Sequence, residues 1–161
     1  MNKKISLLVT DIDGVLTDGT VLLSPPYNVG GAKTLCFKDF DAVSMLKGAG
    51  VDICIITGEN DGFVDEVIRR FQPERCIAGC KDKANAINEL SKESGIPLHE
   101  IAYIGDGKYD IPALELAGYG MCPRDAINEV RSIADEVLDV DGGHGCLASA
   151  YTRINMLNNY H

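Results

Sequence analysis

The 161-residue sequence lacks any apolar run near the roughly 18 residues that a membrane-spanning helix requires. It has no cleavage site of small residues after its first apolar segment, so we expect no signal peptide and a cytoplasmic location. Internal repeats, low-complexity tracts and linkers are also missing. These absences argue against a membrane protein or a multidomain chain, and the length predicts a single domain over residues 1–161.

Basic side chains are scarce. The sequence holds 15 lysines and arginines against 24 aspartates and glutamates, which gives a formal net charge of -9. Because nucleic acids require a basic binding surface, this balance argues against nucleic acid as a partner. It does not exclude a small anionic substrate, since a bound cation can reverse the local field in an acidic protein.

Cysteine pairs with metal-binding spacing are absent, although the sequence holds 6 cysteines. No two of them form a C-x-x-C motif, and Cys54 lies inside an apolar run. We therefore interpret the cysteines as reduced thiols that pack as small apolar side chains, rather than as a disulfide or zinc framework.

Short apolar runs alternate with segments of helical periodicity along the chain, which is typical of βαβ units. The pattern predicts an α/β fold, a Rossmann-like doubly wound parallel sheet with helices on both faces and no cap domain. The expected strands are residues 5–10, 51–56 and 101–104, with weaker candidates at 75–78, 118–121 and 136–140. The expected helices are residues 42–49, 63–71 and 83–94, with a helical tail at 147–157.

One segment interrupts this alternation. Residues 20–23 and 33–37 have the composition of two extended arms, and residues 24–31 between them are rich in turn-forming proline and glycine. We expect a β-hairpin that projects from the loop after the first strand, over about residues 19–37.

Polar side chains follow the predicted strands at the points where they end. Asp11 and Asp13 come directly after the first strand, Thr57 after the second, and Asp106 after the run at 101–104, while Lys83 begins a helix. Because ligands bind beyond the carboxyl ends of strands in open parallel sheets, we expect these side chains to converge on one site.

Carboxylates gathered at one point repel one another by several kcal/mol at an effective dielectric of about 20, so such a site requires a cation. Oxygen ligands of this kind suit Mg²⁺, which accepts one or two carboxylates together with water and a substrate phosphate. We expect Asp11 and Asp106 to bind the metal through their side chains, and Asp13 to bind it through its backbone carbonyl.

This set of groups predicts phosphoryl transfer. Asp11 would attack phosphorus and form an acyl phosphate, and Asp13 would act first as general acid and then as general base. The hydroxyl of Thr57, the backbone N–H of Gly58 and the ammonium of Lys83 would bind the transferring oxygens. The residues therefore predict a Mg²⁺-dependent phosphatase.

Four motifs stand in a fixed order along the chain: Asp11-Ile12-Asp13-Gly14, Thr57, Lys83 and Gly105-Asp106-x-x-x-Asp110. With them the sequence resembles the haloacid dehalogenase superfamily of phosphatases over almost its whole length. It is most similar to the capless branch that acts on 3-deoxy-octulosonate 8-phosphate or nonulosonate (sialic-acid type) 9-phosphate. The residues matching that branch are Asp11 to Gly19, Phe37-x-x-x-Asp41, Ile55-Ile56-Thr57-Gly58, Lys81-Asp82-Lys83 and Gly142-Gly143-His144-Gly145.

The resemblance implies a homotetramer in which hairpins build a central barrel and a neighbouring subunit closes each site. It also bears on the substrate. Glu59 after the Thr-Gly pair resembles the nonulosonate type, whereas Ala148 and Ser149 replace the Arg-Glu pair usual in this branch. Arg69 and Arg70 either bind a sugar carboxylate or are solvated residues at a helix end.

Two other functions stay open. A phospho-aspartate receiver domain uses similar groups, but it places its phosphorylated aspartate after the third strand, where this chain offers only Gly79-Cys80-Lys81-Asp82. A non-catalytic oligomerisation module, like the C-terminal part of some sialate cytidylyltransferases, would be expected to lose the nucleophile that this chain retains as Asp11.

Overall fold

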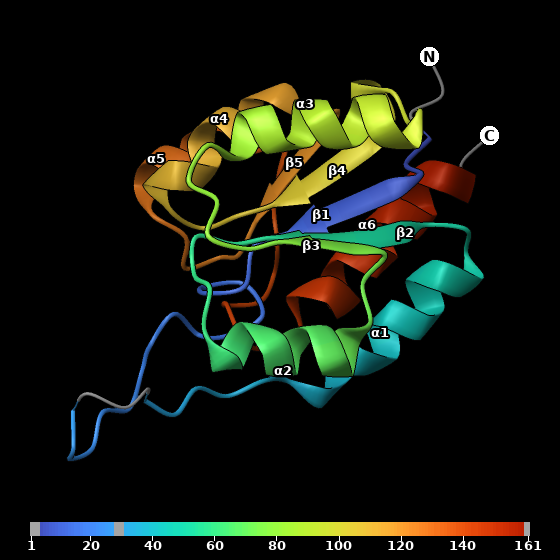
Figure 1. The fold of residues 1–161 in the computed structure, drawn as a ribbon. Coiled ribbons are helices and arrows are strands. Elements are labelled where there is room, and N and C mark those ends of the chain that lie inside the picture. Colours follow the sequence, from blue (N-terminus) through green and yellow to red (C-terminus); the bar gives the residue numbers. More distant parts are fainter. Residues whose placement is uncertain (1–3, 28–30, 160–161) are drawn as a thin grey trace.

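A computed structural model describes residues 4–27 and 31–159 of the chain (Figure 1). Its centre is a six-stranded sheet in the order β3-β2-β1-β4-β5-β6, and every pairing is parallel. The strands are β1 (Leu7–Thr10), β2 (Asp52–Ile56), β3 (Arg75–Ile77), β4 (Ile101–Ile104), β5 (Tyr119–Cys122) and β6 (Glu136–Val137). This sheet confirms the predicted doubly wound, Rossmann-like fold.

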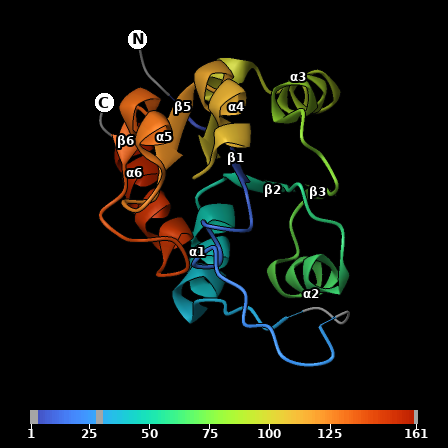
Figure 2. The same ribbon diagram turned by 90° about the vertical axis from the view of Figure 1, so that its left-hand side faces the viewer.

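Helices cover both faces of the sheet, with α3 and α4 on one side and α1 and α2 on the other (Figures 1 and 2). The α-helices are α1 (Phe37–Gly48), α2 (Gly62–Phe71), α3 (Lys83–Ser94), α4 (Ile111–Leu116), α5 (Asn128–Ile133) and α6 (Cys146–Asn159). Two short 3-10 helices are η1 (Leu98–Glu100) and η2 (Lys108–Asp110).

Two hydrophobic cores result, one on each face of the sheet. Leu8 of β1 belongs to the core that α1, α2 and α6 cover, whereas Leu7 and Val9 belong to the core under α3, α4 and α5. Successive side chains of a strand point to opposite faces, so a central parallel strand must be apolar at every position. This requirement explains why the strands could be recognised as short, continuous apolar runs.

Helix α1 begins at Phe37 rather than at residue 42. The prediction that Phe37 ends the second hairpin arm is therefore wrong. The buried positions of α1 are Asp39, Ala42, Val43 and Leu46, a regular helical stripe whose first member is a carboxylate. A polar residue at this position hides the start of the helix from a hydrophobic pattern. The short helices α4 and α5 were not expected either, because six residues are too few to display a period.

The hairpin projects away from the sheet (Figure 1). Its two arms pair through one antiparallel bridge between Leu22 and Ala32, with N···O distances of 2.9 Å in both directions. The predicted turn includes residues 28–30, which lie outside the described residues. Val21, Leu22, Leu23 and Tyr27 are exposed apolar side chains on the described part of the hairpin. No helix in the described ranges is long and apolar enough to span a membrane.

Candidate active site

Asp11 stands at the carboxyl end of the central strand β1, where the chain leaves the sheet. Its backbone N–H donates to the carbonyl of Ile104 at the end of β4, with an N···O distance of 3.0 Å. One carboxylate oxygen, Oδ1, accepts the backbone N–H of Ile12 at 2.7 Å, which fixes the orientation of the side chain. The other oxygen, Oδ2, faces the ammonium of Lys83.

Lys83, the first residue of α3, is a buried cation with only 3% of its side chain exposed. Its Nζ atom lies 2.7 Å from Asp11 Oδ2 and 2.7 Å from Asp110 Oδ1. Burial lowers the pKa of Lys83, but the carboxylates of Asp11 and Asp110 outweigh burial and raise that pKa above its ordinary value. The ammonium is therefore held between two carboxylates at the bottom of the site.

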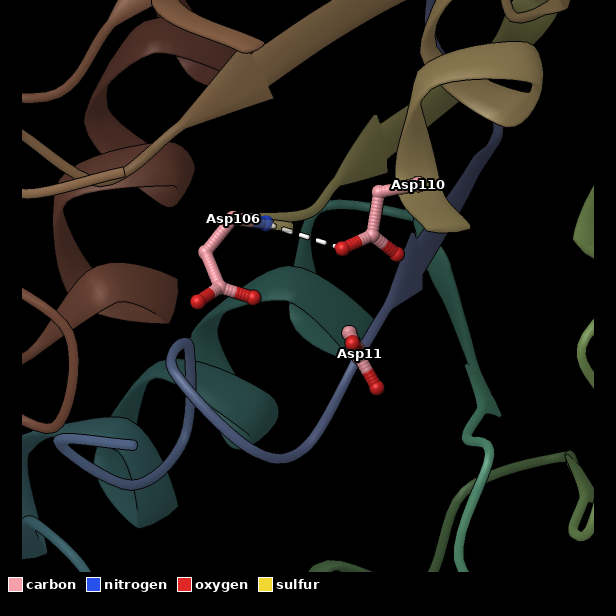
Figure 3. A group of neighbouring side chains, drawn as sticks. All are labelled: Asp11, Asp106 and Asp110. Atoms are coloured by element: carbon pink, nitrogen blue, oxygen red, sulfur yellow. Dashed lines mark hydrogen bonds between the residues drawn. The ribbon is translucent and has the colours of Figure 1, made fainter. Parts of the chain in front are cut away.

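Asp110 is a site residue to which the sequence assigned no role. Its Oδ2 accepts the backbone N–H groups of Asp106 and Gly107, both at 3.0 Å, and Figure 3 shows the first of these bonds. Its Oδ1 accepts hydrogen bonds from the hydroxyl of Tyr103 at 2.6 Å and from Lys83 at 2.7 Å. The available signal was the spacing of Gly105-Asp106-x-x-x-Asp110, which places this carboxylate at the third residue of the turn η2.

Asp11, Asp106 and Asp110 form an acidic cluster in which one oxygen of each side chain lies within 4.8 Å of the others. Burial raises the pKa of Asp11 to about 6 although the Lys83 ammonium opposes this shift. Burial, followed by the charges of Asp110 and Asp11, raises the pKa of Asp106 to about 7. Buried carboxylates this close together fit a hard divalent cation such as Mg²⁺, which offsets the cost of burying their charges as well as their mutual repulsion.

The carboxylate of Asp13 lies apart from that cluster and is held by the hairpin. Its two oxygens are 2.8 and 2.9 Å from Nζ of Lys33, which lies on the second arm. The Thr17 hydroxyl also donates to Asp13 Oδ1 at 3.2 Å. Asp110, rather than Asp13, thus supplies the third carboxylate of the cluster, and the expected metal contact of Asp13 through its backbone carbonyl stays a prediction.

Gly14 lets the loop after β1 approach Asp106 closely. Its φ angle is +84°, and a Cβ atom built on it would lie 1.9 Å from Oδ2 of Asp106. On the other side of the same loop, a Cβ on Gly142 would lie 2.1 Å from the carbonyl oxygen of Gly14. Only glycine at these positions permits the close packing that brings β1, β4 and the loop before α6 together.

A cavity of about 230 Å³ opens over these groups. Thr57, Gly58 and Glu59 line it where the chain leaves β2, and the Thr57 hydroxyl also accepts the backbone N–H of Glu59 at 3.3 Å. Every predicted catalytic, phosphate-binding and metal-binding residue lines this cavity. They are Asp11, Asp13, Thr57, Gly58, Lys83 and Asp106, and Glu59 joins them.

Arg70, the other predicted substrate residue, does not line this cavity. Its Nε atom lies 2.5 Å from Oε1 of Glu66, and its guanidinium stacks at 5.9 Å over the ring of Phe40. Ala148 and Ser149 lie in the first turn of α6, where Ala148 donates its N–H to Asp39 and Ser149 donates its hydroxyl to Asp139. The structure thus brings Glu59 to the site and leaves Arg70 in a neighbouring groove.

Known proteins resemble the chain over most of its length. A family model for haloacid dehalogenase-like hydrolases matches residues 77–147. The 3-deoxy-D-manno-octulosonate 8-phosphate phosphatase KdsC of Haemophilus influenzae is 30% identical over 145 residues, which cover 89% of this chain and 78% of that protein. The enzyme of the same name from Escherichia coli K12 is 27% identical over 145 residues, covering 90% and 76% of the two chains.

Solved structures lead to the same group. The 3-deoxy-D-manno-octulosonate 8-phosphate phosphatase from Moraxella catarrhalis, in complex with magnesium, phosphate and KDO, superposes with a TM-score of 0.91 at 30% identity, over 98% of this chain and 90% of that one. The cobalt-bound enzyme from Haemophilus influenzae superposes with a TM-score of 0.89 at 28% identity, over 97% and 90% of the chains. The chain therefore belongs to the haloacid dehalogenase-like hydrolases, in the branch of the 3-deoxy-octulosonate 8-phosphate phosphatases, and is a phosphatase.

Proposed function

We propose that the chain hydrolyses a phosphate monoester through a phospho-aspartate on Asp11, with Mg²⁺ as cofactor. The observation that carries this proposal is the position of the Asp11 carboxylate. It lies 2.7 Å from the Lys83 ammonium, and within 4.8 Å of oxygens of Asp106 and Asp110, in one cavity. A nucleophile, a cation and a metal site are thereby available to a single phosphoryl group.

In this proposal Asp11 and Asp106 would hold the metal through their side chains, with the backbone carbonyl of Asp13 as a further ligand. When bound, Mg²⁺ neutralises charge on the phosphoryl oxygens and on the attacking carboxylate. Asp110 already accepts four hydrogen bonds, so its main contribution is to hold Lys83 and the loop of Asp106 in place. Two solved relatives bind cobalt and magnesium, respectively.

Phosphoryl transfer then proceeds in two steps. An oxygen of Asp11 forms a bond to phosphorus while the bond from phosphorus to the ester oxygen breaks, and the carboxyl of Asp13 gives its proton to that leaving oxygen. Asp13 then takes a proton from water, whose oxygen attacks the acyl phosphate and releases inorganic phosphate. Thr57, Gly58 and Lys83 bind the transferring oxygens throughout.

A sugar-acid phosphate is the substrate class that we propose. Relatives from several bacteria are named for 3-deoxy-octulosonate 8-phosphate, whereas Glu59 in this cavity favours a nonulosonate 9-phosphate. Glu59 would accept hydrogen bonds from hydroxyl groups of the sugar. Arg70 would contribute only after separating from Glu66, to which it is bound.

We also propose that the single domain over residues 1–161 assembles as a cytoplasmic homotetramer. The exposed apolar side chains of the hairpin support assembly, because Leu22 is 73% and Tyr27 is 72% exposed. A neighbouring subunit would close the catalytic cavity and exclude water from the acyl phosphate. Size-exclusion chromatography with light scattering measures the number of subunits directly.

The two alternatives have less support. A receiver domain needs its phosphorylated aspartate after the third strand, whereas Asp11 and Asp13 both follow β1 and only Thr57 follows β2. A non-catalytic module has no reason to retain a buried lysine between two carboxylates.

The variant Asp11→Asn tests the proposed function. It keeps the shape of the side chain but removes the nucleophile, so phosphate release should fall at least about 10³-fold while the fold persists. Asp18→Asn is the matched control, because Asp18 lies in the same loop but outside the cavity and hydrogen-bonds to Thr20. Acid-quenched wild-type enzyme should carry a labile phosphoryl group on Asp11. Substantial turnover by Asp11→Asn would remove Asp11 as the nucleophile.

A further inference from the structure

A second cavity of about 820 Å³ adjoins the catalytic cavity, between the hairpin, the loop after β1 and the start of α2. Asp13 and Glu59 line both cavities, so a substrate whose phosphate occupies the first can extend into the second. Its volume is ample for a sugar of eight or nine carbons. This second cavity is where the non-phosphate part of the substrate would lie.

Lys33 is the only cationic side chain among the described residues that line this second cavity. The acidic side chains around it have other partners or roles. Glu66 pairs with two arginines of its own helix, and Asp61 caps α2 by accepting the N–H groups of Phe63 and Val64. A substrate anion that enters this cavity can therefore reach one ammonium, that of Lys33.

The ammonium of Lys33 is already in use when the site is free of substrate. It lies 2.8 and 2.9 Å from the two oxygens of Asp13, and 5.1 Å from the centre of the Phe63 ring. The side chains of Lys33 and Asp13 are 14% and 32% exposed, so this pair stands at the boundary between the two cavities. While the pair is closed, both oxygens of Asp13 are turned to the hairpin.

We propose that Lys33 is a specificity residue. When a substrate with a carboxylate enters, the Lys33 ammonium separates from Asp13 and binds that carboxylate. Asp13 is then free to act on the ester oxygen. This inference rests on the proposed function, because it needs a phosphate ester that also carries a carboxylate. The ammonium keeps a carboxylate partner throughout the exchange, because it gains the carboxylate of the substrate as it gives up that of Asp13. Recognition of the sugar acid thus activates the acid–base group of the reaction.

Because of this exchange, the enzyme discriminates between phosphate esters with and without a carboxylate through kcat as well as through binding. A phosphate ester without a carboxylate leaves the pair of Lys33 and Asp13 closed, so both oxygens of Asp13 stay bound to the ammonium and kcat is low. A sugar-acid phosphate opens the pair and is hydrolysed quickly. Arg70 cannot replace Lys33 in this role while Glu66 holds it in the neighbouring groove.

The variant Lys33→Met tests both roles of Lys33, the binding of the substrate carboxylate and the restraint of Asp13. Its kcat/KM would be compared with that of wild type for 3-deoxy-octulosonate 8-phosphate, a nonulosonate 9-phosphate and p-nitrophenyl phosphate, which has no carboxylate. We expect kcat/KM for the preferred sugar-acid phosphate to fall at least about tenfold, through a higher KM and a lower kcat. We expect kcat for p-nitrophenyl phosphate to rise severalfold, because Asp13 is released to activate the water that hydrolyses the acyl phosphate. Lys33→Arg should keep most of the preference.

Lys92→Met is the matched control, because Lys92 makes the same kind of contact with Glu89 on the exposed side of α3. Thermal unfolding and light scattering verify that the variants keep their fold and assembly. If Lys33→Met does not fold, Lys33→Gln carries the same comparison. Equal losses of kcat/KM on both classes of substrate, or an unchanged preference for the sugar-acid phosphate, would overturn this inference but not the proposed function. Wild-type enzyme that releases phosphate from p-nitrophenyl phosphate but from no sugar-acid phosphate would overturn the proposed substrate class, and this inference with it.

Discussion

The hydroxyl of Tyr103 donates a hydrogen bond of 2.6 Å to Oδ1 of Asp110, from a position in β4 that is 0% exposed. Burial, with the nearby charge of Asp110, raises the pKa of Tyr103 well above its ordinary value, so the phenol stays protonated and donates. Asp110 in turn binds Lys83, which contacts Asp11. A completely buried side chain thus orients the cation that, in the proposed mechanism, binds the transferring phosphoryl group.

Removal of that hydroxyl should therefore affect turnover. In Tyr103→Phe, Asp110 loses one of four hydrogen bonds, so Lys83 is held less firmly, and we expect kcat to fall about threefold to tenfold with little change in KM. The free energy of unfolding should fall by about 1 kcal/mol. Tyr119→Phe is the control, since that hydroxyl donates to Glu136 away from the site. An unchanged kcat beside the lower stability would show that Tyr103 acts on the fold alone.

Gly14 should be irreplaceable for metal binding. In Gly14→Ala the new methyl group would meet Oδ2 of Asp106 at 1.9 Å, so the carboxylate must move, and we expect Mg²⁺ affinity to fall at least about tenfold. Gly50→Ala is a matched control because Gly50 has a φ of +76° but no neighbouring atom within 4 Å. Calorimetric titration with Mg²⁺ gives both affinities. Equal affinities would mean that the site tolerates a displaced Asp106.

Metal binding should depend on pH. Protons compete with the ion because the pKa values of Asp11 and Asp106 are raised to about 6 and about 7, so apparent Mg²⁺ affinity should fall as the pH drops from 8 to 6. Excess chelator should abolish phosphate release, and added Mg²⁺ should restore it. Calorimetry in two buffers of different ionisation enthalpy measures the protons released. Affinity that is constant over this range, or full activity in chelator, would contradict the assignment.

Asp39 should make stability depend on pH in an unusual direction. Its Oδ1 accepts the N–H groups of Leu147 and Ala148, whereas its Oδ2 has no partner among the described residues. Burial raises the pKa of Asp39 from 3.8 to about 6. Because the folded state holds the proton more tightly, the charged form costs about 3 kcal/mol above pH 6, and this cost disappears as the pH falls toward 4.

The variant Asp39→Asn isolates this cost. Denaturant unfolding at pH 5 and pH 8 should show that wild type gains stability toward pH 5 relative to Asp39→Asn. Asp41→Asn, on the exposed side of the same helix, should follow wild type. If the free energy of unfolding changes with pH in the same way for wild type and Asp39→Asn, the carboxylate has the same pKa in the folded and unfolded chains.

Sequence reasoning was most successful where a local pattern determines the structure. The runs that became α3 and β4 have the predicted bounds because each is bordered by a strong turn or cap, such as Gly95 after α3. The convergence of Asp11, Thr57, Lys83 and Asp106 on one cavity follows from parallel topology, which the alternating pattern already indicated.

Three side-chain contacts that the sequence did not reveal join distant parts of the chain. Lys33 binds Asp13 across 20 residues, Lys83 binds Asp110 across 27, and Asp39 binds Leu147 across 108. No hydrophobic period marks such polar pairs, because the partner appears only when the sheet is assembled. The pair of Arg70 and Glu66 is different, because it is a local i,i+4 contact within α2 that the sequence spacing could have indicated.

The strand order has a consequence for synthesis of the protein. Strand β1 precedes the other strands of the sheet along the chain, yet it lies in the middle of the sheet between β2 and β4. A ribosome-bound chain therefore cannot complete the surroundings of Asp11 until β4 and Asp110 have emerged. Until then the edge of β1 that pairs with β4 has no partner in the nascent polypeptide, and this is the interval in which a chaperone would be needed most.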